Sequence, residues 1–153
     1  MLYVVTGPPA AGKSTWVQQR AQPGDIVVDF DALAAALTGP GHDGQDGNRS
    51  YPKTLRDVTY RARRAAVDEA LKHCADVDVY VIHSHLSDHA RTIYSDHDAQ
   101  FIVVDPGKAV VLERIRLMRS PSMRAVALRW YASSSPPPVS HSLCSTPQQS
   151  RSW

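Results

Sequence analysis

The sequence predicts a three-layer α/β fold in which a parallel core sheet of about four strands carries helices on both faces. Short apolar runs rich in β-branched residues alternate along the chain with segments of helical periodicity, an order that favours parallel strands joined by crossover helices. A glycine-rich loop separates the first apolar run from the first helical segment. The predicted strands are residues 2–6, 25–29, 77–82 and 101–104, and the predicted helices are residues 14–21, 31–37, 54–74, 88–94, 106–118 and 123–131.

The first part of the chain contains two strand–helix pairs. Residues 2–6 are apolar and mostly β-branched or aromatic, which indicates a short buried strand. The helix that begins at Ser14 must end before Pro23-Gly24, since these residues interrupt helices. A second strand covers residues 25–29, and Asp31 is expected at or near the N-cap of the next helix.

A polar loop and a long helix follow. Residues 38–50 are rich in glycine and polar residues, and we expect a mobile loop there. From residue 54 to 74, apolar positions recur at spacings of three and four, which predicts an amphipathic helix. Three arginines, Arg56, Arg63 and Arg64, are expected to lie off its apolar stripe.

The fourth strand leads into the last helices and a compositionally different end. Asp105 is expected to cap the helix after this strand, with Pro106 at its first helical position. Beyond residue 131 the chain is rich in Ser, Pro and Gln and almost lacks aliphatic side chains. We therefore expect a single domain over residues 1–131 and a disordered tail over residues 132–153.

Charge and cysteine usage bear on partners and compartment. The formal net charge is only +2, but residues 49–64 and residues 108–129 each carry six basic side chains and one acidic one. Such local excess suits a site that handles phosphate, and it also suits solvated helix faces. Cys74 and Cys144 fit no metal or redox spacing, and neither a signal peptide nor a membrane-spanning run is evident. We expect a cytoplasmic protein without a membrane partner.

The most specific motif is the loop between the first strand and the first helix. It fits the pattern G-x-x-x-x-G-K-[ST], in which backbone N–H groups and a helix N-terminus surround a phosphate. Lys13 would reach the β- and γ-phosphates, and the Ser14 hydroxyl would ligate Mg²⁺. The sequence thus predicts an ATP and Mg²⁺ site in a P-loop NTPase fold of the nucleotide-kinase type. Its predicted nucleotide-binding residues are Gly7, Pro8, Pro9, Ala10, Ala11, Gly12, Lys13, Ser14 and Thr15.

Three fates of the γ-phosphate compete: hydrolysis for work, hydrolysis as a switch, and transfer to a substrate. The third strand ends in His83-Ser84-His85, without the carboxylate that a motor ATPase usually has there, which weakens the interpretation as a motor ATPase. The Asn-Lys-x-Asp segment by which GTPase switches recognise guanine is also not present. Transfer needs a carboxylate near the acceptor hydroxyl. Asp29 and Asp31 follow the second strand, on the ligand-binding edge of a parallel sheet. Asp31 is the candidate general base, although it could instead only cap its helix.

Residues 3 to about 131 resemble the 5′-kinase domain of phage-type polynucleotide kinases. The opening Gly-Pro-Pro-Ala-Ala-Gly-Lys-Ser-Thr-Trp is similar to the start of that family. The resemblance implies that Asp31 is the general base. It also implies a lid helix whose arginines bind phosphate, with Arg114 as the transition-state arginine and Arg116 and Arg119 beside it.

The departures from that family concern the acceptor. Ala34 stands where the family often has an arginine for the acceptor phosphate, His83 replaces an acid, and no phosphatase domain follows. The expected acceptor is the 5′-hydroxyl of a polynucleotide, in a phage enzyme acting in the host cytoplasm. Phosphorylation of 5-hydroxymethyluracil in DNA, a small-molecule acceptor, and an AAA-like ATPase acting on DNA remain as alternatives.

Two further groups of residues have two interpretations each. His83, His85 and His89 could form a metal cluster, or one of them could take the place of the missing acid. The basic residues of the 49–64 segment could bind a nucleic-acid strand together with two tyrosines, or form a solvated helix face. These residues are Arg49, Lys53, Arg56, Arg61, Arg63 and Arg64, with Tyr51 and Tyr60.

Overall fold

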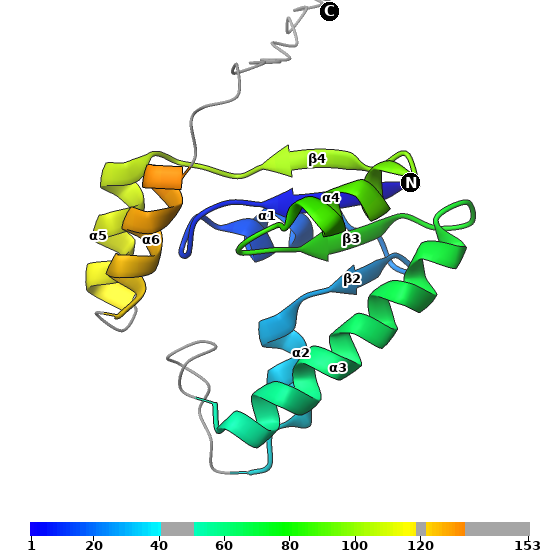
Figure 1. Cartoon of the computed structure of the whole chain (residues 1–153), viewed down its shortest axis with the longest axis horizontal. Coiled ribbons are helices and arrows are strands. Elements are labelled where there is room, and N and C mark those ends of the chain that lie inside the picture. The colour runs from blue at the N-terminus through cyan, green and yellow to red at the C-terminus, as the bar shows by residue number, and fades with distance from the viewer. Residues whose placement is uncertain (41–50, 119–121, 134–153) are drawn as a thin grey trace, which may run out of the picture.

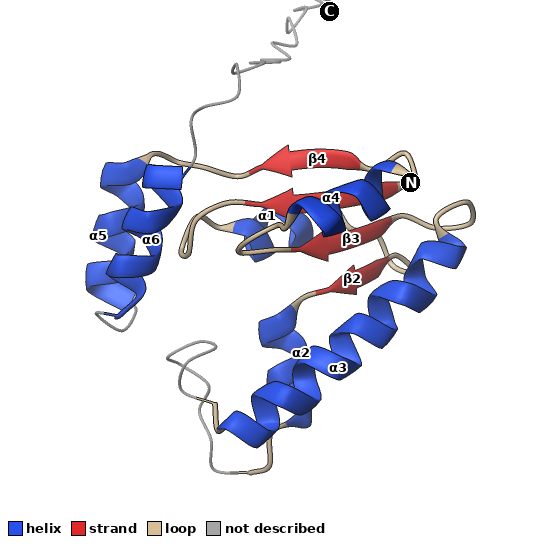
Figure 2. Cartoon of the chain, in the orientation of Figure 1, coloured by secondary structure: helices blue, strands red, loops and turns tan. Residues whose placement is uncertain are grey.

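The computed structural model describes residues 1–40, 51–118 and 122–133, and it has the predicted α/β architecture. Within these residues four strands form one all-parallel sheet in the order β2-β3-β1-β4 (Figures 1 and 2). The strands are β1 (Leu2–Thr6), β2 (Ile26–Val28), β3 (Val79–Ile82) and β4 (Gln100–Val103). The helices are α1 (Lys13–Gln18), α2 (Phe30–Leu37), α3 (Lys53–Ala70), α4 (Asp88–Ser95), α5 (Lys108–Met118) and α6 (Ser122–Ser133), and a 3-10 turn, η2 (Leu71–His73), extends α3.

Helices cover both faces of the sheet because strand residues alternate between two apolar clusters. On one face Val67 of α3 and Tyr94 of α4 pack with Val4 and Val81. On the other face Val17 of α1 packs with strand residues such as Val5. The central strand β3 is buried at all four positions, as expected for a parallel strand with neighbours on both sides.

The C-terminal ends of the strands all point toward the same edge of the sheet. In Figure 1 the arrowheads face α5 and α6, and α2 begins directly beyond β2. A separate apolar cluster, Val111 and Ile115 of α5 with Ala127 of α6, joins these last two helices. Any side chain that follows a strand therefore lies at this edge, where parallel α/β folds bind ligands.

The predicted apolar stripe of α3 is confirmed for most of its length, since Val67 and Ala70 are buried in the core, but it is wrong near the start of the helix. Val58, an expected stripe residue, is 53% exposed, whereas Thr59 is fully buried. The Thr59 hydroxyl donates to the Leu55 carbonyl at 2.8 Å, so its burial leaves the hydroxyl paired. Arg63 also faces inward, because its guanidinium Nη2 donates to the carbonyl oxygen of Ile82 at 2.8 Å. The Ile82 carbonyl at the end of β3 thus holds the Arg63 side chain toward the interior by a hydrogen bond.

At two helix starts, those of α2 and α5, the residues that form the turn differ from prediction. Asp29, not Asp31, caps α2: its Oδ1 accepts from the Asp31 N–H at 3.1 Å, and Asp31 lies in the first turn. Helix α5 begins at Lys108 rather than Pro106, because Gly107 has a φ of +99° and interrupts the helical path. Asp105 instead accepts hydrogen bonds from the Gly107 N–H and the Tyr131 hydroxyl, at 2.9 and 2.6 Å.

The predicted ends of the domain can be compared only in part. Helix α6 runs to Ser133, so the expected boundary at residue 131 falls inside a helix. Most of the expected tail, residues 134–153, lies outside the described residues, as do residues 41–50 of the expected loop. Among the described helices, none has the length and apolar character needed to cross a membrane.

Candidate functional site

The phosphate loop joins β1 to α1 and closes around the side chain of Lys13. The Lys13 ammonium donates to the carbonyl oxygens of Gly7 and Pro8, each at 2.9 Å, and the side chain is buried. Gly12 has a φ of +98°, which lets the chain turn directly into α1. A buried lysine held by main-chain carbonyls at a helix N-terminus fits the binding of an anionic triphosphate.

Gly7 is required by a close approach between the loop and the end of β4. Its φ is +149°, and a Cβ atom added there would lie 2.1 Å from the carbonyl oxygen of Val104. A side chain at this position would therefore push the loop away from the sheet.

We expect Gly7→Ala to lower the free energy of unfolding by at least about 3 kcal/mol, since backbone strain and a backbone clash add together. Gly24→Ala is the matched control, because Gly24 also has a positive φ of +102° but no atom lies within 4 Å of the added Cβ. Strain alone should cost about 1–2 kcal/mol there. Urea unfolding of both variants measures the difference, and equal losses would contradict the clash.

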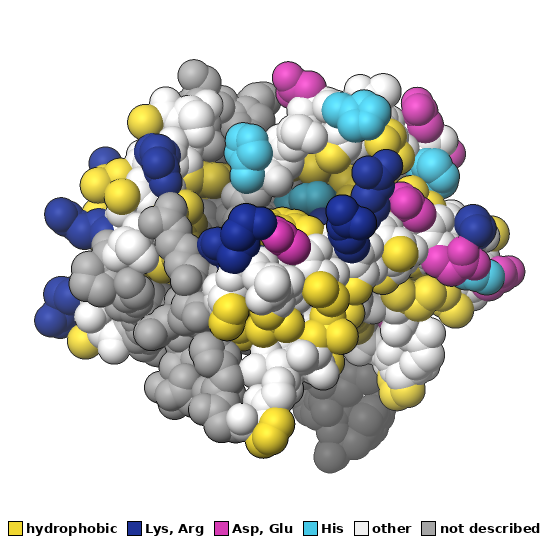
Figure 3. All heavy atoms as spheres, turned by 60° about the horizontal axis from the view of Figure 1, so that its bottom comes forward, with side chains coloured by type: hydrophobic (Ala, Val, Ile, Leu, Met, Phe, Trp, Pro, Cys, Tyr) yellow, Lys and Arg dark blue, Asp and Glu magenta, His cyan; other side chains and the backbone are white. Residues whose placement is uncertain are grey.

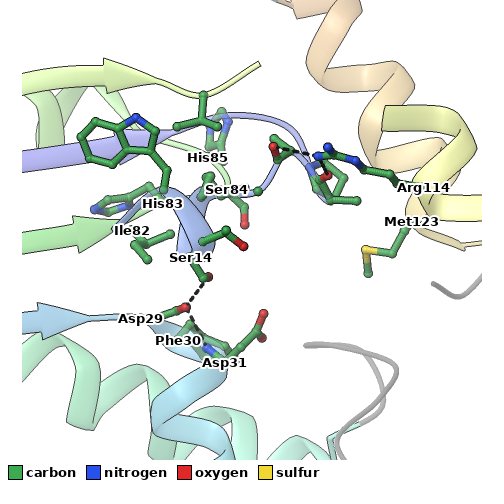
Figure 4. Close-up of a pocket in the computed structure, with 18 of the residues that line it drawn as sticks. Ser14, Asp29, Phe30, Asp31, Ile82, His83, Ser84, His85, Arg114 and Met123 are labelled. Carbon is green, nitrogen blue, oxygen red and sulfur yellow. Dashed lines mark hydrogen bonds between the residues drawn. The ribbon is translucent and has the colours of Figure 1, made fainter. Parts of the chain in front are cut away.

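A carboxylate from β2 reaches the phosphate loop. The Ser14 hydroxyl donates to Asp29 Oδ2 at 2.8 Å, while Asp29 Oδ1 caps α2 (Figure 4). A hydroxyl and a carboxylate at this spacing are the oxygen ligands that Mg²⁺ prefers, directly or through water. From the sequence, Ser14 is predicted at the metal, whereas Asp29 is predicted only at the ligand-binding edge of the sheet. The signal was its position immediately after the strand, two residues before Asp31.

Asp31 lies on the first turn of α2 and lines the same cleft. In Figure 4 its side chain points away from α2, on the side toward Ser14. The pKa of Tyr51, just before α3, is raised mainly by burial and secondly by the negative charge of Asp31. The two carboxylates after β2 are therefore in different situations, with Asp29 bonded to the phosphate loop and Asp31 at the open side.

The end of β3 supplies histidine in place of an acid. His83 Nε2 lies 2.8 Å from the Tyr94 hydroxyl, and the two rings meet edge to face. Burial, and next the charge of Arg63, lowers the pKa of His83 to about 4. His83 is thus neutral at pH 7. Over the described residues, no three His, Cys, Asp or Glu side chains are grouped so as to hold a metal ion, so the histidine cluster considered from sequence is not formed there.

We expect His83 to weaken the fold in acid. Because the pKa in the folded chain, about 4, lies below the unfolded value of about 6.5, the unfolded chain binds the proton first. Stability is complete above about pH 6.5 and falls toward pH 4, by up to about 1.4 kcal/mol per pH unit from this group. Urea unfolding from pH 7.5 to 4.5 should show a shallower acid slope for His83→Gln than for the parent chain. Parallel slopes would contradict the assignment.

Arg114 of α5 contacts the phosphate loop directly. Its Nη1 donates to the carbonyl oxygens of Ala10 and Ala11, at 3.3 and 3.2 Å, and it lines the cleft (Figure 4). Arg116 does not line the cleft; it is exposed and makes two hydrogen bonds to Glu113, at 2.9 and 2.7 Å. Arg119 lies outside the described residues. Of the two predicted lid arginines that lie within the described residues, Arg114 reaches the loop and Arg116 does not.

These residues surround one open cleft of about 800 Å³ at the C-terminal edge of the sheet. Of the predicted loop residues, Gly7 and Pro8 lie behind it and the others line it. Phe30, Tyr60 and Arg63 also line the cleft. From sequence, Tyr60 and Arg63 are expected either to bind a nucleic-acid strand or to lie on a solvated helix face, and Phe30 has no predicted role. The lining residues are Pro9, Ala10, Ala11, Gly12, Lys13, Ser14, Thr15, Trp16, Gln19, Asp29, Phe30, Asp31, Tyr60, Arg63, Ile82, His83, Ser84, His85, Val104, Arg114 and Met123.

Comparison with known proteins identifies the domain but no individual relative. A family model described as an AAA domain matches residues 2–116, which extend from β1 to Arg116 in α5. The matched part includes the phosphate loop, both carboxylates after β2 and Arg114. No curated protein matches the chain.

Proposed function

Because the chain belongs to the AAA domain family, whose members share the P-loop NTPase type of fold and bind nucleotide, we propose that it is an ATP-dependent kinase. In this proposal it transfers the γ-phosphate to a hydroxyl group, and the acceptor is the 5′-hydroxyl of a polynucleotide. The observation that supports the proposal most is that the two carboxylates after β2 have different surroundings. Asp29 is bonded to Ser14 of the phosphate loop, and Asp31 lines the cleft beside it.

The proposed reaction uses each of these groups once. The acceptor O–H gives its proton to Asp31, the freed oxygen attacks the γ-phosphorus, and the bond between this phosphorus and the β,γ-bridging oxygen breaks to release ADP. Lys13 and Arg114 offset the negative charge on the migrating group. Ser14 and Asp29 would hold Mg²⁺, which when bound neutralises charge on the β- and γ-phosphates.

Aromatic and basic side chains on the α2–α3 side support a nucleic-acid acceptor. Phe30 and Tyr60 pair with ring centroids 4.7 Å apart, and both line the cleft. Figure 3 brings this side forward and shows Lys and Arg side chains on it. Exposed basic residues of α3 include Lys53, Arg61 and Arg64. Cations that follow phosphates and aromatic rings that stack on bases are the usual means of binding a single strand.

The test supplies γ-labelled ATP together with a panel of acceptors: 5′-hydroxyl DNA, 5′-hydroxyl RNA, DNA containing 5-hydroxymethyluracil, and free nucleosides. We expect label in the 5′-hydroxyl polynucleotides and no label with Lys13→Ala. Label only in 5-hydroxymethyluracil DNA, or only in nucleosides, would show that the proposed acceptor is wrong but that the protein is still a kinase.

A second candidate function, a DNA-dependent ATPase, is favoured by the description of the matching family as an AAA domain. Against it, β3 is followed directly by a neutral histidine, His83, rather than by an acid that could orient a water molecule. The same labelled ATP separates the two functions. Release of labelled phosphate that DNA stimulates, without label in any acceptor, would overturn the kinase proposal.

A further inference from the structure

Arg63 places a positive charge in the cleft at the end of β3, on what we take as the acceptor side. Its guanidinium Nη2 donates to the carbonyl oxygen of Ile82 at 2.8 Å, and the side chain lines the cleft. Its Nε is buried and makes no hydrogen bond to any described residue. Within the described chain no carboxylate lies within ion-pairing distance of it.

The surroundings of Arg63 leave its charge uncompensated. Burial lowers its pKa from the ordinary value, and the neighbouring His83 is neutral. The Asp29 carboxylate acts on it through its charge, but both Asp29 oxygens already accept hydrogen bonds, from Ser14 and from the Asp31 N–H. A partly buried charge without a partner is unfavourable. An anion bound in the cleft would remove this cost.

An aromatic surface lies next to this charge. Tyr60 precedes Arg63 by three residues on α3, so the two side chains are on the same side of the helix. Tyr60 packs against Phe30 at an interplanar angle of 46°, and 54% of the Tyr60 side chain remains exposed. A planar group could stack on this exposed part while an attached anion reaches Arg63.

Position 34, where polynucleotide kinases often have an arginine for the acceptor phosphate, cannot bind an acceptor in this chain. Ala34 is fully buried and does not line the cleft. A longer side chain at position 34 would displace core residues rather than meet a ligand. In the described structure Arg63, which comes from α3 rather than α2, is the cation at the acceptor side.

We propose that Arg63, with the Phe30–Tyr60 pair, forms an acceptor subsite that selects a hydroxyl carried on a nucleotide, with the base on the aromatic pair and a neighbouring phosphate on Arg63. This inference rests on the proposed kinase function, because the acceptor is defined by the transfer reaction. The proposed subsite favours an acceptor nucleotide that carries a phosphate beside the sugar with the reacting hydroxyl. It disfavours nucleosides, which carry no phosphate.

The kinetic test compares thymidine with thymidine 3′-monophosphate, two acceptors that share the same 5′-hydroxyl and differ in the phosphate. We expect the parent enzyme to prefer the monophosphate by about 10–100-fold in kcat/KM, the effect of a charge-assisted hydrogen bond. Arg63→Gln should reduce this preference to less than about threefold and leave KM for ATP unchanged. Arg91→Gln is the matched control, since Arg91 is exposed on α4, does not line the cleft and belongs to no proposed binding surface.

A binding measurement separates failure of the subsite from failure of the kinase function. Thymidine 3′-monophosphate is titrated into each protein without ATP, and the Arg side-chain N–H signals are followed by NMR. We expect weaker binding for Arg63→Gln, and also for Tyr60→Ala, whose exposed side chain can be removed without disturbing the core. If the parent enzyme phosphorylates no acceptor but these losses occur, the kinase proposal fails and the subsite stands.

Two outcomes would overturn the subsite. One is transfer in which Arg63→Gln keeps the full preference for the monophosphate. The other is equal binding of the monophosphate by the parent, Arg63→Gln and Tyr60→Ala proteins. If Arg63→Gln does not fold, Arg63→Lys and Tyr60→Ala decide the question, since lysine keeps the charge but cannot form the two-pronged contact of a guanidinium.

Discussion

Asp31→Asn is expected to lower the rate of phosphoryl transfer by about 10²–10⁴-fold, the usual contribution of a general base. Asparagine has nearly the shape of aspartate but cannot accept the acceptor proton. The cap of α2 should survive, because it is formed by the Asp29 carboxylate and needs only the main-chain N–H of residue 31. Single-turnover transfer of labelled phosphate measures the effect, with ATP affinity determined in parallel.

The control for Asp31 is another carboxylate outside the cleft. Asp68 is exposed on α3 and only pairs with Arg64 at 3.8 Å, so Asp68→Asn should transfer at the parent rate. A further distinction comes from the acceptor-free reaction. Loss of a base that acts on the acceptor should leave slow ATP hydrolysis nearly unchanged. Full transfer by Asp31→Asn would show that this carboxylate is not the base.

The phosphate loop could be predicted from sequence because its residues are contiguous. The residues that define the motif lie between Gly7 and Ser14, and the Lys13 side chain turns back to bond the first carbonyls of the same loop. Asp31 could also be placed at the cleft, since parallel strands bring their C-terminal ends to the same edge of a sheet. Strand and helix identity followed from residue periodicity in the same way.

Arg63 could not be predicted because its position depends on a contact between distant segments. Periodicity counts the apolar character of Val58 and assigns it to the buried side, but it contains no information about the Ile82 carbonyl nineteen residues away. Arg114 and Arg116 illustrate the same limit. Both occur in one basic helix, and only the folded arrangement shows which one faces the loop. The division of roles between Asp29 and Asp31 likewise depends on the exact residue at which β2 ends.

Arg114→Ala is expected to lower the transfer rate by about 10³-fold or more, the range seen for arginines that offset charge on a migrating phosphoryl group. In the structure the Arg114 guanidinium lies against the carbonyls of Ala10 and Ala11, at the side of the loop that faces α5. In the proposed mechanism, a cation at this position offsets the negative charge on the migrating phosphoryl group. Arg114→Lys should retain part of the rate, because it keeps the charge and loses the paired hydrogen bonds.

Arg116→Ala provides the matched control for Arg114. Arg116 is on the same helix but bonds to Glu113 and does not line the cleft, so its loss should change the rate by less than about threefold, because exposed ion pairs contribute little. Because Arg114 also ties α5 to the loop, the thermal midpoint of each variant must be measured. A slow Arg114→Ala enzyme with an unchanged midpoint assigns the loss to charge in the transition state. If the Arg114 and Arg116 variants both transferred phosphate at the parent rate, neither arginine would act on the phosphoryl group.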